Sequence, residues 1–323
     1  MTAFRRQLMI KAKVVPTIPN YFCIVPLVDG VTVRITKTGT SNMTVPELQY
    51  STNGVTWTNY TIGNTITLNN GQKLYWKGNN LQFSTTTSTF YQFNISGDCN
   101  IKGNTMSLLY DDDFEDKTAF PNNRSYIFNG LFRECDIVDA SELLLPATVI
   151  TSYCYYYMFY YCTKLISAPQ LPATTSAQRC YAYMFYNCTS LTVPPSDLPA
   201  KTLASYCYYN MFYNCTSLTT APTIEATTLA TYCCNNMFVR CQFTTAPVLH
   251  ALTLKNYCYT SMFRYCDKLN YVKAMFTTAP GSTYTSSWMQ GVSSSGTYVM
   301  NKNATYSSRG ISAIPTNWTI QKV

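Results

Sequence analysis

A phrase of nine residues that begins and ends with cysteine recurs through the middle of this chain. Its clearest copy contains Cys154, Met158, Phe159 and Cys162. Further copies occupy residues 180–188, 207–215, 233–241 and 258–266, and a weaker one at 127–135 precedes them. The closing cysteines are 25 to 27 residues apart. A period in this range is typical of a solenoid, in which each repeat buries its apolar face only by stacking on its neighbours.

The spacing inside the phrase predicts a short helix. At about 100° per residue, the first Cys, the Met and the last Cys fall within an arc of about 80°, with the Phe beside them. After each phrase comes a run, such as residues 165–169, of leucine and β-branched residues that ends at proline, which predicts a brief strand. Each repeat is therefore expected to consist of a strand, a bend, an extended return and a short helix capped by Thr or Ser.

The 14 cysteines raise the question of disulfides, which this expected geometry opposes. The two ends of one phrase would lie about 12 Å apart, and neighbouring helices about 8–10 Å apart, whereas the Cα atoms of a disulfide lie roughly 4.4–6.8 Å apart. We therefore expect reduced, buried thiols that act as small apolar side chains. Zinc is the alternative, but the spacing matches no usual ligand pattern and His250 is the single histidine. We predict no metal and no cofactor.

Residues 21–110 have a different pattern, of short alternating runs separated by turn signals. The runs are 21–27, 31–36, 48–50, 65–68, 73–77 and 91–95, and Asp-Gly or Asn-Gly pairs follow at 29, 53 and 70. Such pairs between β runs predict tight hairpins, and hence an antiparallel, sandwich-like β domain. We expect it to cover the open end of the solenoid, with Trp57 and Trp76 in or near its core. A sugar-binding role for these tryptophans is the alternative.

Two segments flank this domain. Residues 1–20 read as an arm, either disordered or an anchor in which Phe4, Leu8 and Met9 bury in a partner while Arg5 and Arg6 pair with it. Residues 111–125 read as an acidic junction. Its carboxylates are sufficient to suggest calcium, although a solvated loop is favoured because the glycine and distal Glu of an EF-hand are missing. The acids concerned are Asp111, Asp113, Glu115 and Asp116.

Tyrosine is the residue in excess, with 28 copies. Three successive repeats carry tyrosine on the side of the predicted helix that faces away from the buried stripe, and stacking would align these rings into an exposed ridge. The tyrosines assigned to it are Tyr156, Tyr157, Tyr160, Tyr183, Tyr186, Tyr209 and Tyr213. Tyrosine buries a large area at low entropic cost and keeps a hydroxyl for a partner. The ridge would contact a neighbouring copy, or a host glycan or protein, or simply pack along its own rungs.

Composition argues against several functions. Charged residues are only 12% of the chain and the net charge is +8, without a basic face interleaved with aromatics, so nucleic acid is not expected. No apolar run approaches the roughly 18 residues that span a bilayer, and we recognise no signal segment. A single histidine and the lack of known catalytic signatures argue against an enzyme. A glycosidase carboxylate pair remains the one open catalytic scheme.

The repeats also resemble a known family. Met211 and Phe212, followed by Tyr-Asn-Cys-Thr-Ser-Leu up to Leu218 and then Ala221 and Pro222, are similar to the BspA-like (Treponema pallidum-type) leucine-rich repeat. The likeness covers residues 126–280, although these repeats are slightly longer than the family period. It is strongest for the gut Bacteroidales and phage branch. Closing phrases such as Gly-Thr-Tyr-Val at 296–299 fit the same branch, and the opening Phe-Arg-Arg resembles the starts of phage virion proteins.

The residue patterns and the resemblance together predict an α+β chain with five parts. These are the arm (1–20), the β domain (21–110), the junction (111–125), six leucine-rich repeats of short strands and short helices (126–280), and a β cap (281–323). The resemblance further implies a non-catalytic virion component (a head fibre, decoration or tail-associated protein), assembled in the bacterial host cytoplasm, that joins other virion proteins through its arm and forms a homo-oligomer, provisionally a trimer. The alternative is a bacterial cell-surface adhesin that binds host or glycan ligands.

Overall fold

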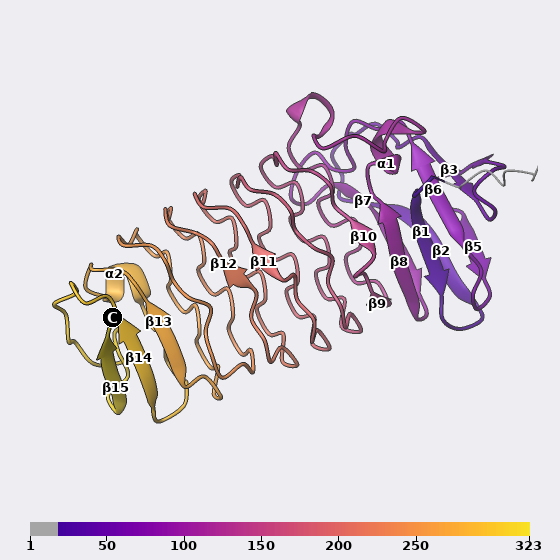
Figure 1. Cartoon of the computed structure of the whole chain (residues 1–323). Coiled ribbons are helices and arrows are strands. Elements are labelled where there is room, and N and C mark those ends of the chain that lie inside the picture. Colours follow the sequence, from indigo (N-terminus) through magenta and orange to yellow (C-terminus); the bar gives the residue numbers. More distant parts are fainter. Residues whose placement is uncertain (1–18) are drawn as a thin grey trace, which may run out of the picture.

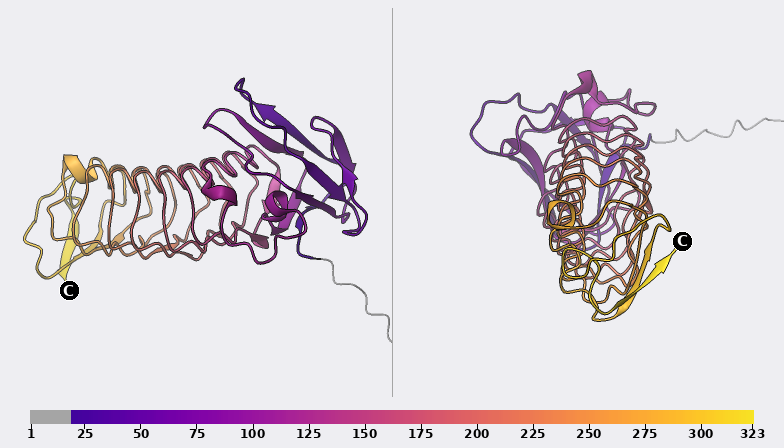
Figure 2. Two further views of the ribbon diagram at one scale, coloured as in Figure 1. Left: turned by 90° about the horizontal axis from the view of Figure 1, so that it is seen from above. Right: turned by 90° about the vertical axis from the view of Figure 1, so that its left-hand side faces the viewer.

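The computed structural model describes residues 19–323 as an elongated molecule with a β domain at one end, a stack of rungs, and a small sheet at the other end (Figure 1). Seen from above, the rungs lie one after another along a straight body from which the β domain leans to one side (Figure 2). The predicted repeat solenoid with sheets at its N-terminal end is therefore confirmed at this level.

The β domain contains eight strands in two sheets. They are β1 (Phe22–Pro26), β2 (Val31–Thr38), β3 (Leu48–Ser51), β4 (Thr58–Asn59), β5 (Thr65–Leu68), β6 (Leu74–Gly78), β7 (Phe90–Ser96) and β8 (Cys99–Asn104). One sheet has the order β8-β1-β6-β3-β4 and the other β5-β2-β7, and all these pairs are antiparallel. Six strands coincide with predicted runs, whereas β4 and β8 were missed.

Aromatic side chains fill the space between the two sheets. Trp76 of β6 is fully buried and meets Phe93 of β7 edge-on, with ring centroids 5.2 Å apart. Phe22 of β1 lies against the same Phe93 at 5.4 Å. In β2 buried and less buried residues alternate strictly, so Val31, Val33 and Ile35 all point into the core from the second sheet.

The β domain continues into the solenoid without a break in hydrogen bonding. Strand β8 pairs in parallel with β9 (Ile137–Asp139) and β10 (Leu143–Leu144), which belong to the first repeat. On the other side, the Phe93 N–H donates to the Leu131 carbonyl. The domain therefore provides the surface on which the first rung is stacked, and the short helix α1 (Ser107–Tyr110) and the 3-10 turn η1 (Pro121–Asn123) link the two parts.

The nine-residue phrases are not helices, and this part of the prediction is wrong. Each phrase is a ribbon of consecutive tight turns, and its residues alternate in their hydrogen bonding. The Met158 N–H donates to the Tyr155 carbonyl within its own rung, whereas the Phe159 N–H donates to Met184 of the next rung, at 2.9 Å. Within residues 19–323 the only α-helices are α1 and α2 (Ser282–Thr285), of four residues each, so the chain is mostly sheet and turn rather than α+β.

Every fourth residue of each ribbon has a left-handed backbone. In the second copy these residues are Tyr153, Tyr157 and Tyr161, with φ near +60°, and the same three positions recur in all six copies. A residue with positive φ at the third place of a four-residue turn gives a type II turn, and such turns alternate here with turns of negative φ. The ribbon therefore repeats after four residues, which is why its burial pattern imitates a helix.

The interior of the stack consists of columns of identical side chains. The Phe of each phrase stacks on the Phe of the next, with ring centroids 5.3 to 6.0 Å apart from Phe132 to Phe263. Phe93 of β7 begins this column, 5.7 Å from Phe132, and Trp288 ends it, 6.1 Å from Phe263. The Cys and Met columns beside it are buried, as the spacing predicts.

All 14 cysteines are buried and free, although the rungs lie closer together than the predicted helices would and are not too far apart for disulfides. Successive rungs are joined by backbone hydrogen bonds, so they are separated by about 4.8 Å, as in a sheet, rather than by the distance between helices. That spacing lies within the range of a disulfide. Instead, each closing thiol points at a backbone carbonyl one rung back, as Cys188 does to Phe159 at 3.1 Å and Cys215 to Phe185 at 3.1 Å.

Short extended segments form the other walls of the stack. Strands β11 (Asp197–Leu198) and β12 (Thr223–Ile224) pair in parallel, and isolated bridges such as Ser167 to Val193 join other rungs. The C-terminal end adds β13 (Tyr271–Ala274), β14 (Gly296–Met300) and β15 (Trp318–Lys322), which form a parallel sheet. Residues 284–291 repeat the ribbon hydrogen bonds once more, with Trp288 in the place of the Met.

Candidate recognition surface

The turn ribbons present one face of the solenoid to solvent, and tyrosine dominates it. Along each phrase two residues point inward and the next two point outward. Thirteen tyrosines on this face form one network in which each ring lies 4.1 to 5.6 Å from another. We call them the tyrosine face: Tyr126, Tyr153, Tyr156, Tyr157, Tyr160, Tyr161, Tyr183, Tyr186, Tyr206, Tyr209, Tyr213, Tyr232 and Tyr257.

Three tyrosines assigned to the ridge form a regular column. Tyr160 stacks on Tyr186 at 5.1 Å with an interplanar angle of 17°, and Tyr186 on Tyr213 at 4.8 Å with an angle of 7°. The guanidinium group of Arg133 covers the open face of Tyr160 at 5.0 Å. All three tyrosines are half-buried, so each ring is held by its neighbours in the column while its outer part meets solvent.

The other assigned tyrosines connect this column to the rest of the face. Tyr157 and Tyr183 are half-buried and 4.9 Å apart, and Tyr209 lies 5.4 Å from Tyr183. Tyr156 is only 5% exposed and packs edge-on against Tyr183. Tyr156 is therefore a support for the face rather than part of its outer surface.

A second outer column was missed. The residue before the first Cys of each phrase carries a ring or a guanidinium group in all six copies. Tyr206 stacks on Tyr232 at 4.7 Å and Tyr232 on Tyr257 at 4.7 Å, while Arg179 lies 4.4 Å from Tyr206 and 5.8 Å from Tyr153. The signal was present in the sequence, because the same register holds tyrosine in five of the six copies.

The stacking determines what the face offers a partner. Because most ring faces in these columns are occupied by other rings or by arginine, the main outward features are ring edges, which carry partial positive charge, and hydroxyl groups. No hydrogen-bond partner within residues 19–323 is found for the hydroxyls of Tyr160, Tyr186 and Tyr213. Burial, and then the nearby hydroxyls of Tyr161 and Tyr157, raise the pKa of Tyr160 to about 12, so it remains a neutral donor.

The acidic junction is organised around a lysine. The ammonium group of Lys77 lies 3.0 Å from Asp111 and 2.7 Å from Asp112, and the Tyr21 hydroxyl donates to Asp112 at 2.6 Å. Asp113 pairs with Lys117 at 2.8 Å. In the part of the chain described here, no group of three or more His, Cys, Asp or Glu side chains is arranged to hold a metal ion.

The tryptophans of the β domain lie in its interior or are covered. Trp76 is fully buried. Trp57 is half-buried, with the Lys77 ammonium group 4.8 Å above its ring and the edge of Tyr21 at 4.8 Å. The Lys77 ammonium group therefore covers one face of the Trp57 ring.

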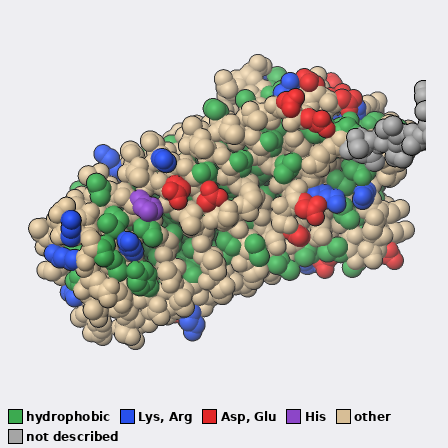
Figure 3. All heavy atoms as spheres, in the orientation of Figure 1, with side chains coloured by type: hydrophobic (Ala, Val, Ile, Leu, Met, Phe, Trp, Pro, Cys, Tyr) green, Lys and Arg blue, Asp and Glu red, His purple; other side chains and the backbone are tan. Residues whose placement is uncertain are grey.

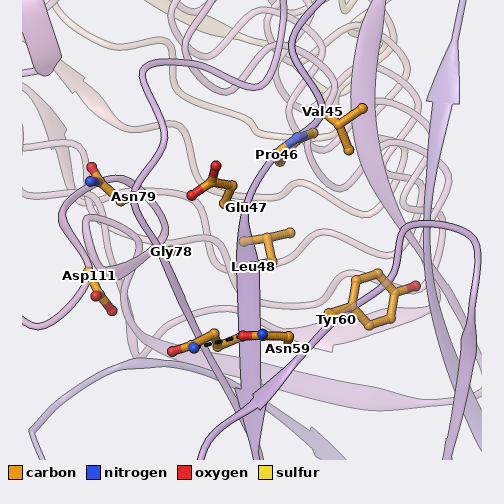
Figure 4. A pocket seen from close by; sticks show the side chains of 10 residues that line it. Val45, Pro46, Glu47, Leu48, Asn59, Tyr60, Gly78, Asn79 and Asp111 are labelled. Carbon is orange, nitrogen blue, oxygen red and sulfur yellow. Dashed lines mark hydrogen bonds between the residues drawn. The ribbon is translucent and has the colours of Figure 1, made fainter.

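Two adjoining hollows lie beside the edge of the larger sheet, with volumes of about 510 and 460 Å³. The first is lined by β3, the end of β6 and the junction, and includes the carboxylates of Glu47 and Asp111 (Figure 4). The backbone of Glu47 is fixed by Asn80, whose side chain both accepts from its N–H and donates to its carbonyl. Since Asp111 is already paired with Lys77, this hollow does not present two unpaired carboxylates.

The proposed anchor residues Phe4, Arg5, Arg6, Leu8 and Met9 lie outside the described residues. A search of residues 19–323 finds no helix with the length and apolar character that crossing a membrane requires. Comparison with known proteins gave no match to a family model, a curated protein or a solved structure.

Proposed function

We propose that this chain is a non-catalytic recognition protein that uses the tyrosine face to bind a neighbouring protein subunit. The observation that carries the proposal is the continuity of the face, in which thirteen tyrosines, some stacked and some edge-on, contact one another over six rungs. A rigid array of this kind loses little entropy on binding, because each ring is already held in place by its neighbours.

A protein partner fits the chemistry of the face better than a neutral glycan does. Sugars bind aromatic residues through exposed ring faces, and in the two outer columns most ring faces are stacked on a neighbouring ring. Hydroxyl groups, ring edges and guanidinium groups instead suit the carbonyl and carboxylate oxygens of another polypeptide. A second copy of the chain is the simplest partner, which agrees with the homo-oligomer expected above.

The family resemblance supports a narrower form of the proposal. If the rungs are a variant of the BspA-like leucine-rich repeat, the chain is a virion component of a tailed phage, attached through its N-terminal arm and with its solenoid directed outward. Its localisation would then be the virion, with a bacterial cell surface as the alternative. A mass-spectrometric inventory of purified particles tests this, and absence of the chain from particles whose genome encodes it would refute the virion assignment.

Replacement of Tyr160, Tyr186 and Tyr213 tests the role of the face. We expect the wild type to self-associate in sedimentation experiments and the triple Tyr→Ser variant to be monomeric, because it loses both ring area and hydroxyls. The triple Tyr→Phe variant keeps the stacked column and should associate with intermediate strength. Comparing the two variants therefore separates the contribution of the tyrosine rings to self-association from that of their hydroxyl groups.

Thermal unfolding of each variant controls for damage to the fold. A Tyr→Ser variant that remains folded and associates as the wild type does would contradict the proposal. The proposal would also be contradicted if the wild type were monomeric and the Tyr→Ser variant were incorporated into purified particles as well as the wild type is.

A further inference from the structure

Charge is distributed unevenly along the molecule. Residues 19–239 contain eleven Lys and Arg against fourteen Asp and Glu, a net of −3, whereas residues 240–323 contain eight basic residues against one acid, a net of +7. Figure 3 shows Lys and Arg side chains around the C-terminal end of the solenoid, whereas Asp and Glu side chains lie along its middle and, together with further Lys and Arg, at the β-domain end. The basic residues of this C-terminal end are Arg240, Lys255, Arg264, Lys268, Lys273, Lys302, Arg309 and Lys322.

None of these eight side chains forms an ion pair within the described residues. Every ion pair found there involves cations between Lys77 and Lys164. Six of the eight are exposed, and only Arg264 and Lys273 are half-buried. Their positive charge is therefore not neutralised by the protein and acts on the surrounding solution.

Several of these cations are fixed in position by neutral groups. Arg309 donates to the carbonyls of Pro315 and Trp318, and Lys322 donates to the carbonyl of Ala304. Arg264 lies 4.7 Å from the ring of Tyr265 and donates to its hydroxyl at 3.0 Å. By contrast, the exposed Lys255, Lys268 and Lys302 have no side-chain partner in residues 19–323 and are free to meet a ligand.

The surface between the cations is rich in hydroxyl and amide groups. Exposed examples include Ser282, Thr283, Ser294, Ser295, Asn303 and Ser307. Such groups suit a partner that carries many hydroxyls as well as negative charges. Single-stranded nucleic acid would require several open aromatic faces, whereas of the two exposed tyrosines here Tyr265 is covered by Arg264 and Tyr257 is stacked on Tyr232. A membrane would require a broad exposed apolar patch, whereas only three large aliphatic side chains of residues 240–323 are exposed, namely Leu252, Ile311 and Val323.

From these observations we infer that the C-terminal end of the solenoid binds an acidic polysaccharide, whose carboxylate or sulfate groups meet the unpaired lysines. This inference goes beyond the proposed function, because it concerns a second surface and a different class of ligand. It assigns the tyrosine face to a protein neighbour and the C-terminal end to a glycan.

Retention on an immobilised polyuronate, alginate, tests the inference with full-length protein. A variant with Lys255→Glu, Lys268→Glu and Lys302→Glu should lose affinity by roughly a hundredfold, taking about a fivefold effect for each lost cation. The matched control carries Lys37→Glu, Lys73→Glu and Lys201→Glu, three exposed lysines of the N-terminal part. Both triple variants have the same net charge, and the control should bind as the wild type does.

If both triple variants lost affinity for alginate equally, the effect would be one of net charge alone, and the inference would be overturned. It would also be overturned if both variants bound alginate as the wild type does. The inference would likewise be overturned if the wild-type protein failed to bind alginate, or if it bound neutral dextran as tightly as it binds alginate. Binding of a single-stranded DNA oligonucleotide or of anionic lipid vesicles at comparable affinity would reject the polysaccharide as the ligand class. The Tyr160, Tyr186 and Tyr213 serine variant should retain alginate binding, so the two proposals fail separately.

Discussion

The residues with a left-handed backbone conformation are the positions at which a single substitution is expected to affect the stability of a rung most directly. Asparagine and glycine adopt this conformation more readily than other residues, and Gly130, Asn187, Asn210, Asn214 and Asn236 occupy such positions. Tyrosine occupies many of the others, where stacking on the next rung compensates for the strain. The outer columns therefore help to set the backbone as well as the surface.

Asn236, with φ of 55°, provides a test because its side chain makes no hydrogen bond within residues 19–323. Asn236→Val should lower the free energy of unfolding by about 1–2 kcal/mol, because a β-branched residue is strained in this conformation. Asn236→Gly should differ from wild type by less than about 1 kcal/mol. Urea denaturation measures both, and since both remove the amide, equal destabilisation would show that the backbone conformation is not responsible.

At the scale of elements, the solenoid and its buried columns could be predicted, but the ribbon could not. If the first Cys of each phrase is counted as position 0, the residues that point inward are those at positions 0, 1, 4, 5 and 8. This spacing fits one face of a helix nearly as well as it fits a chain of turns, as Cys154, Met158 and Cys162 show. Recurring Asn and Tyr at every fourth position, as at Asn210 and Asn214, contain the distinguishing information. That information becomes decisive only when hydrogen bonds to the next rung are known, because isolated turns of this kind have little stability of their own.

The same limit applied to the candidate site. Tyr160, Tyr186 and Tyr213 could be aligned from the repeat period alone. The burial of Tyr156 and the second outer column depend on the ribbon geometry, in which outward residues come in pairs rather than on one helical stripe. Strand β8 was missed because Lys102, Gly103 and Asn104 give it no alternating apolar pattern.

Substitutions of Phe185 and Tyr186 allow the contributions of the inner and outer columns to stability to be compared within one rung. Phe185 is fully buried between Phe159 and Phe212, so Phe185→Ala should cost about 3–5 kcal/mol through lost packing and a cavity. Tyr186→Ala removes a half-exposed ring from an equally regular stack and should cost about 1 kcal/mol. Denaturant unfolding of the two variants gives the difference, and similar costs would mean that the outer column contributes as much to stability as the core.

On the scale of the whole molecule, the buried thiols and phenols make stability sensitive to alkali. Burial raises the pKa of Cys180 from its ordinary value of 9.0 to about 12, and that of Cys162 likewise to about 12, while the pKa of Tyr181 is raised well above 10.0. The unfolded chain loses these protons first. The stabilisation is therefore complete below about pH 9 and is lost as the pH rises from 9 toward 12.

Each buried thiol should remove about 1.4 kcal/mol of stability per pH unit in that window, and the contributions of many thiols add. We expect the urea midpoint to be nearly constant from pH 7 to 8 and to fall steeply from pH 9 to 10, in the presence of a reductant. Substituting two closing cysteines, Cys188→Ala and Cys215→Ala, should make the fall shallower. A midpoint that stays level to pH 10 would argue that the thiols are exposed or already ionised in the native state.

The backbone hydrogen bonds between rungs have one further consequence. Each copy offers its successor the same donors, acceptors and inward side chains that it receives from its predecessor, so a copy in the middle of the stack is interchangeable with any other. Recombination inside the coding sequence can then delete or duplicate a unit of about 26 residues without leaving an unmatched neighbour. The reach of the molecule changes by about 4.8 Å for each such event, while the surfaces at its two ends are inherited unchanged.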